Sequence, residues 1–403
     1  MIRVKDKREC CGCWACKNVC PKQCIAMVED DEGFRYPKVD SSNCIDCGLC
    51  EKVCPIILKK EVTPIRQNAF VVQNKDPKVL KESTSGGFFS AIANYVLSKG
   101  GVIIGCHLNE KFEAEHIVVD CSEKLSQFRN SKYVQSNIGD AYQQAKALLQ
   151  EGRFVLFSGT PCQLEGLLNY LRKPYDNLYT VDVVCRAVPS PLILRKYLEM
   201  QQRMRGELQA VKFRDKYHGY KYSTMSLSVK NGNDYHEGID TDVYLRSFFS
   251  GVNIRPSCTD CKFRSRYRRT DFTIWDCYNI DTFSKDLDND LGATRVICHT
   301  DRSYKIMYEL SKELRIKEID VEKAVKGVKE MVSGPVFHIK RDGFFADINN
   351  PHYTTEEVFH KYFPITLRHR FEKQVRLWSN RLGLYKLLKK IFKAIIRNNE
   401  ISR

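Results

Sequence analysis

Short apolar runs alternate with amphipathic segments through the middle of the chain. Runs typical of strands lie at 69–73, 102–104, 117–119, 154–157 and 178–184, and segments with apolar residues at helical spacing lie at 88–97, 140–149 and 161–171. Strands that alternate with helices favour βαβ units and a mainly parallel sheet. The pattern predicts an α/β body, and an α+β chain once the flanking regions are included.

Two of these predicted strands are followed closely by a cysteine. The fourth run leads into Thr160, a suitable N-cap, and Pro161, a suitable first helical residue, so Cys162 falls in the first helical turn. There the helix dipole lowers the pKa of a thiol. The fifth run ends at Cys185. If a right-handed crossover joins the two strands, they are parallel neighbours, and both cysteines lie where open α/β sheets bind ligands.

The composition is that of a folded protein. Hydrophobic residues make up 43% of the 403 residues and charged residues 28%, which allows a large core and disfavours global disorder. No apolar run approaches the ~18 residues of a membrane span, and the first residues lack the apolar stretch of a secretory signal. We therefore expect a cytoplasmic protein.

The positive charge is concentrated at the end of the chain. The formal net charge is +16, and residues 361–403 hold 12 basic and 2 acidic residues. The arginine-rich stretch at 264–269 is short and lies beside cysteines, so it suits an anionic cofactor, a partner or solvent better than nucleic acid. We expect no nucleic-acid partner.

The 18 cysteines are the most informative part of the composition. A cytoplasmic chain keeps its thiols reduced, so this number indicates metal or redox chemistry. Two runs, which begin at Cys10 and Cys44, share the spacing C-x2-C-x2-C-x3-C-P. That spacing is typical of bacterial ferredoxins with two [4Fe–4S] clusters.

In such ferredoxins the fourth cysteine of each run binds the cluster of the other run. We therefore predict one cluster on Cys10, Cys13, Cys16 and Cys54, and a second on Cys44, Cys47, Cys50 and Cys20. A pair of structural zinc sites is the alternative, because thiolates also suit zinc. Cys11 and Cys24 fall outside the repeat and are predicted to be packing residues.

A further cysteine pair, Cys258-x2-Cys261, lies among arginines. Together with Cys162 and Cys185 it supplies four thiolates, enough for a third [4Fe–4S] cluster. The spacing alone leaves open a zinc knuckle, a redox-active pair or buried free thiols. The remaining cysteines, predicted to lie in the core, are Cys106, Cys121, Cys277 and Cys298.

From about residue 5 to residue 315 the chain resembles the coenzyme F420 hydrogenase/dehydrogenase beta-subunit family. The segments that carry the resemblance are Thr84-Ser85-Gly86-Gly87, Ser131-Lys132-Tyr133-Val134, Ser158-Gly159-Thr160-Pro161-Cys162-Gln163, Val188-Pro189-Ser190-Pro191, Phe213-Arg214-Asp215-Lys216 and Arg255-Pro256-Ser257-Cys258-x2-Cys261. Each motif is weak alone, but their combination and order are specific.

The resemblance implies an oxidoreductase in which FAD exchanges a hydride with a deazaflavin, coenzyme F420, and iron–sulfur clusters carry single electrons. It implies a third cluster on Cys162, Cys185, Cys258 and Cys261, and a flavin surrounded by Ser85, Gly86, Gly87 and Lys132. Glycines let a backbone approach a cofactor closely, and a lysine stabilises an anionic reduced flavin. A plain helix-entry turn and a solvated lysine are the alternatives, and no catalytic acid or base is identified.

The chain departs from the family pattern in two places. Cys185-Arg186-Ala187 occurs where members of the family often have Cys-His-Gly. Trp275 occurs where a glycine is usual, and its side chain would fill space that a ligand could occupy. The alternative functions are therefore a non-catalytic electron-transfer subunit with a decayed flavin or deazaflavin site, or an accessory protein, for example in surface-polysaccharide synthesis. No Rossmann fingerprint or P-loop supports NAD(P). We expect a redox protein or a small hydride carrier as partner.

The chain ends in a basic amphipathic segment. Apolar residues recur at helical spacing from 366 to 397, at Leu367, Phe371, Val375, Trp378, Leu382, Tyr385, Leu388, Ile391 and Ile395. Such a helix can contact the inner membrane face peripherally, or dock on its own domain or a partner. We predict a ferredoxin-type domain at 1–60, a flavin and iron–sulfur domain at 67–315, an extension at 316–365 and the helical tail at 366–403.

Overall fold

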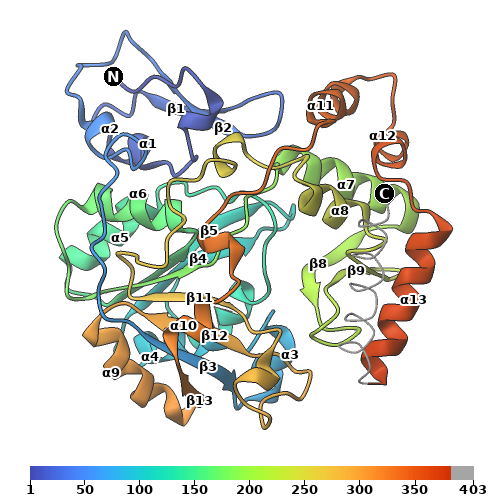
Figure 1. Cartoon of the computed structure of the whole chain (residues 1–403). Helices are drawn as coiled ribbons and strands as arrows, with labels where there is room; N and C mark the ends of the chain where they lie inside the picture. Colours follow the sequence, from blue (N-terminus) through green and yellow to red (C-terminus); the bar gives the residue numbers. More distant parts are fainter. Residues whose placement is uncertain (383–403) are drawn as a thin grey trace, which may run out of the picture.

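The computed structural model describes residues 1–382. The N-terminal region, in blue, lies over one end of a large layered body, and a smaller group of strands and helices lies beside that body (Figure 1). No helix in this part of the chain is long and apolar enough to cross a membrane. Of the predicted tail helix, α13 (Leu367–Arg381) is described, and the stretch from 383 onward lies outside the described residues.

The large body is built on an eight-stranded sheet with the order β13-β3-β12-β11-β7-β6-β4-β5. Its strands are β3 (Asn68–Asn74), β4 (Val102–Leu108), β5 (Ala114–Val119), β6 (Val155–Gly159), β7 (Leu178–Val183), β11 (Phe272–Asp276), β12 (Thr294–Cys298) and β13 (Leu314–Ile319). The central strands β4, β6, β7 and β11 are parallel, whereas the flanking pairs are antiparallel. The predicted α/β class is confirmed, as a mixed sheet with a parallel centre.

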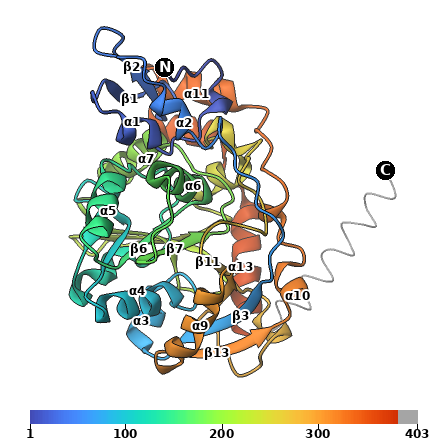
Figure 2. The same cartoon turned by 90° about the vertical axis from the view of Figure 1, so that its left-hand side faces the viewer.

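Helices cover both faces of this sheet (Figure 2). The helices α4 (Phe88–Ser98) and α9 (Asp301–Glu309) pack on one face, and α5 (Ala141–Gln150) and α6 (Pro161–Leu171) on the other. Side chains alternate between the two cores along each strand, so Leu156 packs with α4 and Phe157 with α5 and α6. A strand buried on both faces must be apolar throughout, which explains the short uninterrupted runs in the sequence.

The parallel pair β6 and β7 positions two of the predicted ligands. Their register pairs Phe157 with Thr180, so the strands are adjacent as predicted. After β6, Thr160 and Gln163 form a capping box that begins α6, which places Cys162 in the first turn of that helix. After β7, Ser190 caps α7 (Pro191–Arg205), and Cys185 lies in the intervening loop.

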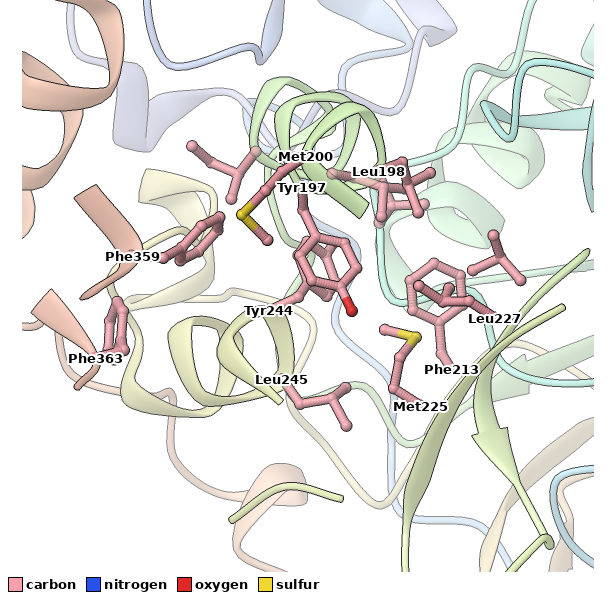
Figure 3. Close-up of a cluster of buried hydrophobic side chains, with 14 of the residues drawn as sticks. Tyr197, Leu198, Met200, Phe213, Met225, Leu227, Tyr244, Leu245, Phe359 and Phe363 are labelled. Carbon is pink, nitrogen blue, oxygen red and sulfur yellow. The ribbon is translucent and has the colours of Figure 1, made fainter. Parts of the chain in front are cut away.

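A second core joins the smaller sheet to the C-terminal helices. The antiparallel strands β8 (Leu208–Asp215), β9 (Thr224–Val229) and β10 (Tyr235–Gly238) pack with α7, α8 (Val243–Ser250), α11 (Arg341–Asn349) and α12 (Thr355–Tyr362). Figure 3 shows Tyr197 and Met200 of α7 facing Tyr244 of α8 and Phe359 of α12. Residues 341–363 are therefore part of this core, since Phe344, Phe359 and Phe363 are buried in it.

The N-terminal region consists of α1 (Ala15–Val19), the antiparallel hairpin β1 (Ile25–Glu29) and β2 (Arg35–Val39), and α2 (Leu49–Lys52). Its helix α1 packs on α5 and α6, so this region rests on the same face of the large sheet as those helices. The other short helices are α3 (Pro77–Glu82) and α10 (Val321–Val325), with 3₁₀ turns at Lys7–Glu9, Ser122–Phe128, Pro256–Cys258, Ile280–Thr282, Leu310–Lys312 and Lys329–Met331.

Candidate iron–sulfur and flavin site

The two N-terminal cysteine runs fold into loops with the same backbone. In the first loop the residues with positive φ are Gly12 at 67° and Trp14 at 66°, and in the second they are Asp46 at 49° and Gly48 at 68°. These pairs occupy equivalent positions of the repeat, one residue before and one after the second cysteine. The repeat in the sequence is therefore also a repeat of a tight left-handed turn, which wraps the thiols of each loop around one centre.

The first loop is buried against the body. Cys13 and Cys16 are buried, Cys10 is half-buried, and Cys54 from the second run lies beside them. Burial raises the pKa of Cys16 and of Cys54, the latter to about 11, and a charge on Cys13 would raise both further. Neutral thiols are thus favoured unless a cation compensates them, and iron binding would release their protons.

The second loop lies at the surface. One cavity there is lined by Cys20 of the first run, by Cys24, and by Cys44, Cys47 and Cys50. Cys47 is exposed, whereas Cys50 is buried and its Sγ accepts a hydrogen bond of 3.3 Å from the backbone N–H of Ile2. Cys24, which the sequence assigned to packing, is buried with its Sγ 3.4 Å from that of Cys20.

The placement of the fourth cysteines matches the crossed arrangement expected for two clusters. Cys54 lies with the thiols of the first loop, and Cys20 lies with those of the second. Within residues 1–382, no three His, Cys, Asp or Glu side chains converge as they would on a single metal ion. The donors are soft sulfur atoms spread around a shared centre, and this fits a [4Fe–4S] cluster.

The four cysteines of the predicted third site meet in one cavity. Cys162 and Cys185 from the ends of β6 and β7 line it together with Cys258 and Cys261. Cys11 lines the same cavity, which the sequence analysis missed. In the sequence, its position next to Cys10 is the one hint of a role in cluster binding. Because Cys11 follows Cys10 and lines this cavity, it connects the first loop to the third site.

The thiols of the third site differ in their acidity. A hydrogen bond from Cys11 lowers the pKa of Cys162 to about 7 in spite of burial. Burial, followed by the charges of the other three thiols, raises the pKa of Cys185, and burial raises that of Cys258 to about 12. Cys162 is therefore the thiol of this set that ionises most readily, and it stands at the N-terminus of α6 as the sequence predicted.

A cavity of about 720 Å³ opens beside the third site. Residues 185–188 line both cavities, so they form a common wall. Of the predicted flavin residues, Ser85, Gly87 and Lys132 line this large cavity. Gly86 instead packs against the sheet, where a Cβ would lie 2.2 Å from the carbonyl oxygen of Val72.

The large cavity is positively charged. Its cationic lining residues are Arg129, Lys132, Arg186, Arg214 and Arg295, and its carboxylates are Asp276 and Glu330. Three of the arginines are paired: Arg214 with Asp276 at 3.0 Å, Arg186 with Glu330 at 3.8 Å, and Arg129 with Glu82. Among the described residues, the half-buried Lys132 donates to the carbonyl oxygens of Gln127 and Arg129 and has no carboxylate partner. Burial lowers the pKa of Lys132 to about 8. A cavity of this size and charge suits an anionic dinucleotide.

The segment that departs from the family pattern also lines this cavity. Trp275 lies on its wall, and the indole Nε1 is buried with no hydrogen-bond partner among the described residues. Tyr278 lines it too and stacks on Tyr220 with a centroid distance of 5.2 Å. Cys106 is a half-buried lining residue, Cys121 is half-buried, and Cys277 and Cys298 are buried in the cores.

Comparisons with known proteins agree with the family resemblance and the ferredoxin-type cysteine spacing found in the sequence. Residues 152–324 match the family model for the C terminus of the beta subunit of coenzyme F420 hydrogenase/dehydrogenase, and residues 9–56 match the 4Fe-4S dicluster domain. No curated protein matches the chain. Among solved structures, a chain of the xenon-derivatised F420-reducing [NiFe] hydrogenase complex from Methanosarcina barkeri aligns at 16% identity, over 71% of this chain and 96% of that one, with a TM-score of 0.45.

This structural likeness is too weak to carry an argument, so the assignment depends on the two sequence models. They confirm the predicted resemblance and the ferredoxin-type start of the chain. Residues 9–56 are thus similar to a 4Fe-4S dicluster domain and residues 152–324 to the C terminus of the coenzyme F420 hydrogenase/dehydrogenase beta subunit, and this indicates an iron–sulfur oxidoreductase that transfers electrons.

Proposed function

We propose that this protein is an iron–sulfur flavoenzyme that moves electrons between a hydride carrier and one-electron partners. The observation that carries the proposal is the common wall at residues 185–188, which separates the large cavity from the cavity of Cys162, Cys185, Cys258 and Cys261. When bound, a flavin would exchange electron pairs with the carrier and the clusters would exchange single electrons. Cys185, as a ligand of a third cluster, would place the two groups next to each other.

The walls of the large cavity supply contacts for FAD. Ser85 and Gly87 precede α4, whose N-terminal N–H groups have no side-chain cap and are free to face a pyrophosphate. Arg295 is buried, donates to Asn279 and to the carbonyl of Ala324, and has no carboxylate partner within residues 1–382. A bound anion would supply its counter-charge, and Lys132 would supply another positive group.

The thiol sets form a series from this cavity to the surface. Cys11 lies between the third site and the first loop, the first loop shares Cys54 and Cys20 with the second, and Cys47 of the second loop is exposed. An exposed ligand brings a cluster close to a docking protein. We infer that a redox partner protein binds at the second loop and that the hydride carrier enters the large cavity.

Bulky side chains line the large cavity where the hydride carrier would enter. Coenzyme F420 or another reductant would meet Trp275 and Tyr278 on the cavity wall. These bulky side chains favour a second candidate function, in which the chain is an electron-transfer subunit or accessory protein with no substrate of its own. Flavin binding separates the two candidates, because only the enzyme needs it.

Anaerobic purification followed by iron, sulfide and flavin analysis tests the proposal. We expect about 12 iron atoms per chain for three clusters, whereas about 8 would leave the third site empty. We also expect FAD to bind, roughly tenfold more weakly in Lys132→Met than in the exposed control Lys124→Met. Because Lys132 loses its charge above pH 8, the affinity should fall between pH 7 and pH 9 in the wild type but not in Lys132→Met. An iron-loaded protein that never binds FAD would favour the second candidate.

An exposed apolar face on α13 favours a contact with an anionic membrane surface. Leu367, Phe371 and Trp378 are exposed at helical spacing on a helix that also carries Arg368 and Arg370. We propose that this face lies on the lipid headgroups. We expect the wild type to pellet more with anionic than with neutral vesicles, and Phe371→Ser/Trp378→Ser should reduce pelleting with the anionic ones. Equal pelleting of variant and wild type would refute the contact.

A further inference from the structure

Arg255 lies at the junction between the first cysteine loop and the third site. It is 0% exposed and is among the largest fully buried side chains of the described protein. Its guanidinium lies over the ring of Tyr36, 4.3 Å from the centroid. Its carbonyl accepts a hydrogen bond from the backbone N–H of Cys258, so the residue is part of the turn that carries the third site.

The guanidinium is directed at the first loop. Its Nε donates to the carbonyl of Cys10 at 2.8 Å, and its Nη2 lies 3.5 Å from the Sγ of Cys10 and donates to the carbonyl of Arg35 at 3.1 Å. Its Nη1 donates to the side chain of Gln135 at 2.8 Å. The loop makes room for both side chains with Gly12, where a Cβ would lie 2.4 Å from the Nε2 of Gln135 and 2.8 Å from the Nη1 of Arg255.

The charge of Arg255 has no carboxylate partner. Three other buried arginines do: Arg214 pairs with Asp276, Arg268 with Asp182, and Arg341 with Glu32. Within residues 1–382 no Asp or Glu lies at ion-pair distance from Arg255, and its acceptors are carbonyl and amide oxygens together with the sulfur of Cys10, which would be negatively charged only as a cluster ligand. A buried cation without a counter-charge is costly, so an anion belongs beside it.

We propose that Arg255 is a positioning residue whose buried charge pairs with the thiolate-ligated cluster of the first loop, raises the reduction potential of that cluster, and holds it against the third site. The proposal rests on the cluster assignment made above. Four thiolates make a [4Fe–4S] centre anionic, and reduction adds one more negative charge beside the guanidinium. Nearby charge and hydrogen bonds to ligand sulfur are established determinants of cluster potential.

The test is a redox titration, followed by electron paramagnetic resonance, of the whole protein loaded with iron under anaerobic conditions. In Arg255→Gln we expect one cluster to titrate at a more negative potential than in the wild type while the others keep theirs. Arg255→Lys retains the charge without the planar guanidinium, so the potential of that cluster should lie between its values in the wild type and in Arg255→Gln. The matched control is Arg341→Gln, which removes another buried arginine that ties Glu32 of the N-terminal region to the body, away from the cysteines. It should leave every potential in place.

Each result bears on the proposal. An Arg255→Gln protein with full iron and unchanged potentials would overturn it, as would an equal shift in Arg341→Gln. If Arg255→Gln instead loses about four iron atoms, the proposal stands when Arg255→Lys retains them and fails when Arg255→Lys loses them as well. A wild-type protein without iron would refute the cluster assignment itself, which is a separate outcome.

Discussion

The two cysteine loops have the same spacing and the same turn, but they occupy different environments. Every residue from Cys11 to Cys16 is buried between α6, β2 and the turn at Arg255, whereas residues 45–47 of the second loop are exposed. Each loop has one glycine at a left-handed position, but the position differs between the two loops. The first loop has Gly12 where Arg255 approaches and a buried Trp14 at the other left-handed position, and the second has Asp46 and Gly48.

This difference shows how one repeat supports two roles. A left-handed residue other than glycine costs on the order of 1 kcal/mol, which the burial of the Trp14 indole offsets. At Gly48 nothing lies within 4 Å of an added Cβ, so this glycine serves the backbone alone. The first loop is thus built to contact the body, and the second to be reached from outside.

The largest expected effect concerns the exchange of the fourth cysteines, by which Cys54 serves the first loop and Cys20 the second. Cys13→Ser and Cys54→Ser should each remove one cluster, about four iron atoms per chain. Because both residues lie at the same centre, the double variant should lose no more than either alone, whereas Cys47→Ser/Cys54→Ser should lose about eight. Cys121→Ser, which is outside the repeat and lines none of the three cavities described above, is the control and should keep its iron. An additive loss in Cys13→Ser/Cys54→Ser would contradict the crossed assignment.

A smaller effect is expected on the rate of cluster loss. Because Cys47 is exposed and the first loop is buried, a chelator added under anaerobic conditions should remove iron in two phases, with the second loop's cluster several-fold faster. Iron release recorded by absorbance measures both rates. Cys47→Ser should lack the fast phase, and a single phase in the wild type would show that the two environments do not differ in accessibility.

The smallest expected effect comes from the two glycines. Gly48→Ala meets only the cost of φ 68° in open space and should destabilise the protein by about 1 kcal/mol. Gly12→Ala adds contacts with the side chains of Gln135 and Arg255, 2.4 Å and 2.8 Å from the new Cβ, and should cost roughly 2–4 kcal/mol. The midpoint of thermal loss of cluster absorbance compares them. Equal midpoints would mean that the side chains of Gln135 and Arg255 leave room for a Cβ at Gly12.

Much of the local architecture could be predicted because it depends on near neighbours in the chain. The apolar runs identified the central strands, and Thr160 and Pro161 identified the start of α6. The antiparallel flanks of the large sheet and the packing of α11 and α12 into the second core were not predicted, since they depend on pairings between distant segments. Nor does any local signal place Cys11 in the third cavity.

By itself, the sequence determined the turn and spacing of each cysteine loop, because thiols a few residues apart can surround one centre only through a tight local backbone. Only the tertiary structure decided which loop is buried, that four cysteines from three distant segments line one cavity, and that Arg255 reaches Cys10 across 245 positions of the chain. Burial and charge compensation depend on what packs around a group. That packing is set by the whole fold and not by the neighbours in the chain.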